Sequence, residues 1–180
     1  MRESAIHNKL VRVNARIRPE QAGDKPAIRH VNEVAFGGNE EAILIESLRA
    51  EGAVLLSLVA ELEGRVVAHA LFSRMWIDAD GAQSTAALAL APMAVLPDYQ
   101  RRGLGGWLIL TALDRLGKEG ERIVIVVGHP AYYPRFGFSS EKAQAIESPF
   151  PREAFMALEL TAGALDGVKG KVRYPAAFGI

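Results

Sequence analysis

The chain has 180 residues, with 21 Lys or Arg and 21 Asp or Glu, so its formal net charge at pH 7 is zero. Hydrophobic residues make up 49% and charged residues 23% of the sequence, which is typical of a single globular domain and argues against disorder. The balanced charge argues against a general nucleic-acid or anionic-membrane binder, and the lack of cysteine excludes disulfides, thiolate nucleophiles and cysteine-ligated metals.

No segment approaches the roughly 20 apolar residues that span a bilayer, and residues 1–9 lack the apolar stretch of a signal peptide. A cysteine-free chain also fits a reducing compartment. We therefore expect a soluble, cytoplasmic protein with no metal and with neither nucleic acid nor a membrane as a partner.

The chain is expected to open as a strand followed by two helices. Residues 13–18 alternate apolar and polar or charged side chains, as in a half-buried strand. Asp24 and Pro26 are typical of a helix start, and the glycines at 37–38 end that helix. A second helix is expected within residues 39–52, which begin with an asparagine cap and end with a glycine.

An antiparallel meander of three strands is expected next, over residues 54–62, 65–72 and 84–95. Pro92 lies inside the third strand, where a backbone N–H would normally bond a neighbour. Two interpretations are open at this point. Either the strand ends early, or it bends away from its neighbour at a bulge and leaves backbone groups available to a ligand.

The second half of the chain switches to a strand–helix–strand order, which predicts a parallel crossover. The helix is expected at residues 103–118 and a buried, β-branched strand at 123–127. A short helical piece at 132–136 and a strand at 154–160 follow, and we assign no regular structure to 167–180. One mixed α/β domain is the simplest interpretation.

The strongest chemical signal is the loop Gln100-Arg101-Arg102-Gly103-Leu104-Gly105-Gly106, between a strand and a helix. Backbone N–H groups at a helix N-terminus bind anions, and the helix dipole adds about half a positive charge there. Two adjacent arginines favour a phosphate ligand over a purely structural turn. A P-loop would need a lysine after the glycines, and a dinucleotide fingerprint would need a glycine where Leu108 stands.

The pattern Gln100-x-x-Gly103-x-Gly105, after a proline-interrupted strand, resembles motif A of the GCN5-related N-acetyltransferases, the GNAT superfamily. The family's Tyr-x-x-x-Gly-Phe motif is matched by Tyr133, Gly137 and Phe138. The order of elements over residues 15–160 is similar as well, and the chain looks like an uncharacterised bacterial subgroup.

The resemblance implies an α/β (α+β) fold with one GNAT-like domain over residues 1–180, its core at about 15–160 and a tail at 161–180. The expected sheet is mixed, with an antiparallel N-terminal meander, a splayed strand and helices on both faces.

The resemblance also implies acetyl-CoA as the acyl donor. Its pyrophosphate maps to Arg101, Arg102, Gly103, Leu104, Gly105 and Gly106, and its pantetheine arm maps to backbone groups of Met93, Ala94 and Val95. Tyr133 then corresponds to the phenol that donates a proton to the leaving thiolate, a group of comparable basicity. The implied reaction is direct attack of a neutral amine on the thioester, which needs no covalent enzyme intermediate.

The sequence leaves the general base open among His69, His129 and water. Tyr132 is a second phenol, but its spacing to Gly137 does not match the motif. By the resemblance, Phe36 and the segment between the first two helices belong to the acceptor pocket.

Three functions remain as hypotheses. The favoured one is an acetyltransferase that acts on the primary amine of a small molecule. The alternatives are an acetyltransferase of protein N-termini or lysines, and a non-catalytic CoA-binding module. A homodimer is a further expectation that the resemblance leaves open.

Overall fold

The computed structural model describes residues 15–79, 81 and 83–180, so residues 13 and 14 of the first predicted strand lie outside the described part. The strands are β1 (Ala15–Pro19), β2 (Val54–Leu62), β3 (Arg65–Asp78), β4 (Thr85–Val95), β5 (Ile123–Val127), β6 (Ile146–Glu147), β7 (Phe155–Glu159) and β8 (Gly170–Arg173). The α-helices are α2 (Lys25–Phe36), α3 (Glu40–Ala50) and α4 (Leu104–Lys118). Short 3-10 turns are η1 (Ala22–Asp24), η2 (Pro97–Tyr99), η3 (Tyr133–Phe136) and η4 (Ala176–Phe178).

The strands form one eight-stranded mixed sheet in the order β1-β2-β3-β4-β5-β7, with β8 paired to β3 and β6 paired to β8. The pairs β1–β2, β2–β3 and β3–β4 are antiparallel, β4 and β5 are parallel, and β5 and β7 are antiparallel. The predicted meander and parallel crossover are therefore confirmed.

The helices begin and end where the sequence signals predict. Pro26 lies in the first turn of α2, and Gly37, with φ of +77°, ends that helix in the left-handed conformation that glycine adopts without strain. Gly103, with φ of +84°, occupies the cap position before α4. In both cases a local residue preference fixes the helix boundary.

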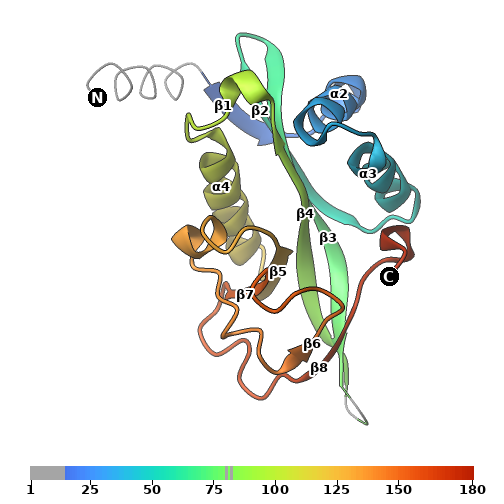
Figure 1. Cartoon of the computed structure of the whole chain (residues 1–180), viewed down its shortest axis with the longest axis vertical. Coiled ribbons are helices and arrows are strands. Elements are labelled where there is room, and N and C mark those ends of the chain that lie inside the picture. Colours follow the sequence, from blue (N-terminus) through green and yellow to red (C-terminus); the bar gives the residue numbers. More distant parts are fainter. Residues whose placement is uncertain (1–14, 80, 82) are drawn as a thin grey trace.

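The sheet separates the helices into two layers. Figure 1 shows α4 on one side of the strands and α2 with α3 on the other. Successive side chains of β3 point to opposite faces of the sheet, so this strand packs against helices on both sides. His69 on β3 contacts Asn32 of α2, while the neighbouring Ala68 and Ala70 are buried on the opposite face.

Two predictions about the fold were wrong. β3 continues to Asp78 instead of ending at residue 72, and the tail predicted to be irregular contains β8, in which Arg173 pairs with Trp76. The cause is a contact between distant segments. Gly170 has φ of +143° and approaches the Asp78 carbonyl so closely that a Cβ would lie 2.1 Å from that oxygen. No local pattern in residues 167–180 predicts this pairing with β3.

In the described part of the chain, none of the helices has the length and apolar character needed to cross a bilayer.

Candidate active site

β4 separates from β5 at the point where Pro92 interrupts it. β4 pairs with β5 only over residues 88–90, whereas its pairing with β3 continues to Val95. The register shifts between Phe72↔Leu90 and Ala70↔Met93, so two residues of β4 oppose one of β3 and form a bulge. Of the two interpretations of Pro92, the bulge is therefore correct. Among the described strands, none pairs with residues 91–95 on the β5 side.

The glycine loop leads into α4 beside this splayed segment. Arg101 has φ of +58°, unusual for a residue with a side chain, and Gly103 follows with φ of +84°. The first N–H groups of an α-helix have no acceptor within the helix, so those of α4 are directed into this loop. The guanidinium of Arg102 lies 5.6 Å from the centre of the Tyr99 ring. The arrangement supplies oriented donors and cationic side chains for an anion.

Tyr133 begins the η3 turn and is nearly buried, with 9% of its surface exposed. Its ring packs on Gly128 at the end of β5, where a Cβ would lie 2.2 Å from the ring carbon Cε2. It also makes an edge-to-face contact with Phe138, with the ring centroids 5.8 Å apart. Burial, aided by nearby Tyr132, raises the pKa of Tyr133 to about 12, so the phenol keeps its proton at neutral pH.

Tyr132 is the site residue that sequence reasoning set aside. A Cβ built on Gly105 would lie 2.8 Å from the Tyr132 hydroxyl and 3.4 Å from Met93 Sδ. The structure thus brings the start of η3 against β4 and the glycine loop, which lie about 30 to 40 residues earlier in the sequence. The motif spacing from Gly137 identifies Tyr133 but does not indicate which side chain packs on α4. A usable signal was the glycine pair at 105–106, because each glycine leaves room for a ring.

Two further residues of η3 complete this contact. The Phe136 ring lies 3.2 Å from the position of a Cβ on Gly106. The guanidinium of Arg135 lies 4.4 Å from the centre of the Tyr132 ring, and its Nε donates a hydrogen bond of 3.1 Å to the Tyr132 carbonyl. Arg135 is exposed, so it adds a positive charge near the glycine loop.

The two histidine candidates lie in different environments. His69 is completely buried on β3, opposite Ala94 of β4, and both of its ring nitrogens have hydrogen-bonding partners. Burial, with a contribution from the charge of Arg49, lowers the pKa of His69 to about 3. His129 is exposed after β5, and its carbonyl accepts the backbone N–H groups of Tyr132 and Tyr133.

The pKa of His69 leads to a prediction about acid stability. Because the folded pKa is about 3 and the ordinary value is 6.5, the unfolded chain binds more protons between these pH values. The free energy of unfolding should therefore fall as pH is lowered from about 6.5 to about 3, by on the order of 5 kcal/mol, and be unaffected by His69 at higher pH. Urea titrations of wild type and His69→Gln across this range measure the effect. If the free energy of unfolding depended on pH equally in the two proteins, the result would contradict this prediction.

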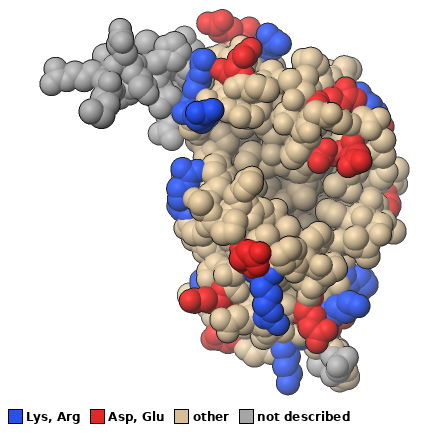
Figure 2. All heavy atoms as spheres, viewed as in Figure 1, with Lys and Arg blue, Asp and Glu red and all other residues tan. Residues whose placement is uncertain are grey.

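The face seen in Figure 2 is hollowed between the side carrying α4 and η3 and the side carrying α2 and α3, and acidic side chains gather over α2 and α3 beside the hollow. Three large apolar side chains of these helices are also exposed, Val34 by 43%, Phe36 by 47% and Ile43 by 49%. In residues 15–79, 81 and 83–180, no three His, Asp or Glu side chains are grouped so that they could hold a metal ion.

Comparison with known proteins agrees with this geometry. The sequence model of the acetyltransferase (GNAT) family matches residues 25–138, which include the splayed strand, the glycine loop and η3. The uncharacterized N-acetyltransferase YjhQ of Escherichia coli K12 is 40% identical over 135 residues, covering 72% of this chain and 74% of the relative.

Two solved structures are similar over most of their length. The GNAT family N-acetyltransferase YhbS from Escherichia coli, in complex with CoA, is 34% identical with a TM-score of 0.85 and covers 93% of each chain. A GNAT family acetyltransferase from Brucella melitensis, in complex with acetyl-CoA, is 35% identical with a TM-score of 0.76 and covers 91% of this chain and 97% of that one.

Proposed function

This chain belongs to the acetyltransferase (GNAT) family and uses acetyl-CoA as its acyl donor, and we propose that the acceptor is the primary amine of a small molecule. One observation carries the proposal. The unpaired edge of β4, the glycine loop and the tyrosine turn η3 meet beside a hollow with acidic side chains over one of its walls.

The residues at this place suit acetyl-CoA. The pyrophosphate requires oriented N–H donors and positive charge, which residues 101–106 supply at the start of α4. The pantetheine arm carries amide groups, which residues 93–95 can bond as an added strand would. A side chain at position 105 would meet the ends of the Tyr132 and Met93 side chains, so glycine here leaves room for both.

The chemistry follows from the side chains around the splay. Bound acetyl-CoA supplies a thioester that a neutral amine attacks directly, with release of the thiol. Tyr133 holds a proton at neutral pH and is our candidate for the group that protonates the departing sulfur. Backbone N–H groups of the splayed segment are the candidates for stabilising the charge that develops on the carbonyl oxygen.

The proton of the acceptor amine is more readily taken by His129 or water than by His69. His69 is buried with both ring nitrogens bonded, and its pKa of about 3 makes it a weak base. His129 is exposed beside η3. A pH profile of His129→Gln against wild type distinguishes His129 from water.

The acceptor class is inferred from the wall formed by α2 and α3. Glu40 and Glu41 begin α3, and their charge attracts a cationic amine before it loses its proton. The exposed rings and alkyl groups of Phe36 and Ile43 can contact the apolar part of the same molecule. These features favour a small amine with an apolar substituent.

We expect acetyl-CoA to raise the melting temperature. At about 100 times its Kd, a ligand that binds only the folded chain adds about 2.7 kcal/mol, or roughly 5–10 °C for a domain of this size. Differential scanning fluorimetry measures the shift, with free adenosine as the control. No shift at millimolar acetyl-CoA would contradict the proposed site.

The acceptor itself is identified by a thiol-release screen with acetyl-CoA against amines, amino acids and peptides. Release with small amines, and not with peptides, supports the proposal. Release with peptides alone would identify a protein acetyltransferase. Binding without release under any condition would indicate a CoA-binding module without turnover.

A further inference from the structure

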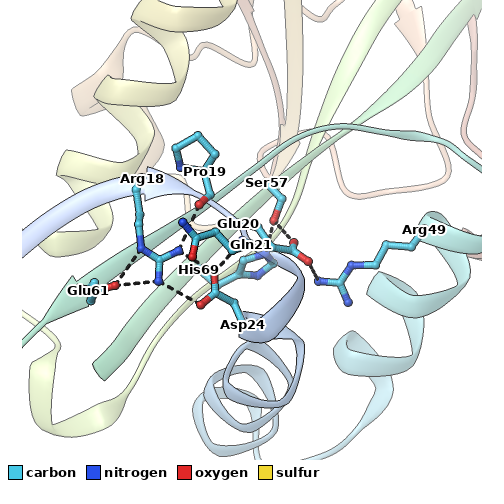
Figure 3. Close-up of polar contacts among 9 residues, drawn as sticks. All are labelled: Arg18, Pro19, Glu20, Gln21, Asp24, Arg49, Ser57, Glu61 and His69. Atoms are coloured by element: carbon cyan, nitrogen blue, oxygen red, sulfur yellow. Dashed lines mark hydrogen bonds and ion pairs between the residues drawn. The ribbon is translucent and has the colours of Figure 1, made fainter. Parts of the chain in front are cut away.

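A continuous chain of polar contacts links α2 and α3 to the strands beneath them, and Figure 3 shows the part of it from His69 to Arg49. Asn32 of α2 contacts His69 of β3 at 3.3 Å between Nδ2 and Nδ1. The Nε2 atom of His69 lies 2.9 Å from the Ser57 hydroxyl of β2. Ser57 donates in turn to the carboxylate of Glu20, at 2.5 Å, and Arg49 of α3 donates to the other oxygen of that carboxylate, at 2.7 Å.

The donors and acceptors of this chain determine where each proton lies. The amide nitrogen of Asn32 can only donate, so Nδ1 of His69 accepts and the proton is on Nε2. Nε2–H then donates to Ser57, whose single hydroxyl proton goes to Glu20. The imidazole is therefore neutral and held in one tautomer. The remaining proton of the Asn32 amide goes to the Ile28 carbonyl, at 2.8 Å.

These contacts tie both helices of the acceptor wall to the central strands. Asn32 is the link from α2, and Arg49 is the link from α3. A neighbouring ion-pair group, in which Arg18 bridges Asp24 and Glu61, connects the N-terminal segment to β2. Figure 3 shows the two groups side by side, with His69 in the group that reaches α3.

His69 also lies next to the proposed reaction centre. It is paired in register with Ala94, so the Cβ atoms of the two residues are separated by about 5 Å on the same face of the sheet. Asn32 and Phe36 are four residues apart on α2 and so occupy neighbouring positions on that helix. Because the two residues share one helix, a shift of α2 at Asn32 would move Phe36 as well.

We propose that His69 is a positioning residue, which holds α2 through Asn32 and α3 through Ser57, Glu20 and Arg49, and so sets the shape of the acceptor site beside β4. The location of the acceptor site rests on the proposed function. The hydrogen-bonded link between the helices and the strands does not.

The test compares two substitutions of His69. Leucine can neither accept from Asn32 nor donate to Ser57, so His69→Leu should raise the KM for the acceptor about tenfold while the Kd for acetyl-CoA stays within about twofold. Glutamine keeps an N–H donor for Ser57, so His69→Gln should recover part of the loss. Ser57→Ala breaks the chain at its next link with a smaller change in volume, and serves if His69→Leu fails to fold.

Glu121→Gln is the matched control, because the Arg74–Glu121 ion pair is also partly buried on the sheet but lies outside the chain from Asn32 to Arg49. This variant should leave the KM for the acceptor unchanged. An unchanged acceptor KM in folded His69→Leu and Ser57→Ala, or an equal rise in Glu121→Gln, would overturn the positioning role.

Hydrogen exchange separates this proposal from the proposed function, since it needs neither acetyl-CoA nor an acceptor. In His69→Leu, the amides of α2 and α3 should exchange about tenfold faster than in wild type while those of α4 do not change. Equal acceleration over α2, α3 and α4 would mean general destabilisation and would overturn the inference. If wild type shows no acetyl-CoA-dependent activity, the proposed function fails while the exchange result still decides the role of His69.

Discussion

Replacing Gly105 with valine is expected to abolish the rise in melting temperature that acetyl-CoA produces. A Cβ at this position would lie 2.8 Å from the Tyr132 hydroxyl and 3.4 Å from Met93 Sδ. The added branches of valine need still more room, so the Tyr132 and Met93 side chains have to move away from the start of α4. Gly105 lies in the proposed phosphate cradle and Met93 on the proposed pantetheine edge, so acetyl-CoA affinity should fall by at least about 100-fold. Scanning fluorimetry and calorimetric titration measure the loss.

Gly117→Val is the matched control on the same helix. Its nearest neighbour is Leu160 Cβ, 4.0 Å from the position of an added Cβ, so the substitution makes the same change in helix propensity without the collision. It should keep the full acetyl-CoA shift. A Gly105→Val protein that also kept the full shift would show that the cradle is not at the start of α4.

A double variant tests the same contact by removing the Tyr132 hydroxyl that an added Cβ would meet. The atom that a Cβ on Gly105 meets first is the hydroxyl oxygen of Tyr132. Gly105→Ala should therefore weaken acetyl-CoA binding, and adding Tyr132→Phe should restore part of it. Additive losses in the two single variants would mean that Tyr132 and Gly105 act independently.

The parts of the structure that the sequence predicts are those with local causes. The glycine at position 103 and the helix that follows it have a spacing signal within ten residues, and so does the end of α2 at Gly37. The interruption at Pro92 is local as well, because proline cannot donate to a strand partner, although the sequence leaves open whether the strand ends or bulges there.

The parts that the sequence does not predict depend on distant contacts. β8 exists because Gly170 fits against Asp78, 92 residues earlier in the chain. Tyr132 belongs to the site because Gly105 leaves room for it, and the link from His69 to α3 passes through three separate segments. Each residue alone has an ordinary local interpretation, and only the fold brings the partners together.

The neutral net charge is compatible with a polyphosphate ligand, because the fold gathers a few positive charges in one place. An extended anion would require many cations, but a pyrophosphate requires only a few donors in one place. Arg101 and Arg102 stand at the start of α4, and Arg135 stacks on Tyr132 beside it. The acidic residues that balance them include those of α2 and α3, on the other side of the hollow.

Replacing Tyr133 with phenylalanine is expected to lower kcat about 100-fold and to leave the Kd for acetyl-CoA within about twofold. The substitution removes only the hydroxyl, so the ring still packs on Gly128 and Phe138. Because burial raises the pKa of Tyr133 to about 12, the phenol remains protonated throughout the range in which the protein can be assayed. The loss in kcat should therefore be independent of pH between about 6 and 9.

Tyr132→Phe is the matched control, since it removes a hydroxyl from the adjacent ring, which touches the glycine loop instead of the end of β5. We expect this variant to change acetyl-CoA affinity more than kcat. Steady-state and single-turnover kinetics of both variants show which hydroxyl donates the proton, because single turnovers isolate the chemical step from thiol release. A larger loss of kcat in Tyr132→Phe than in Tyr133→Phe would assign the proton donor to Tyr132, against the motif spacing that identified Tyr133.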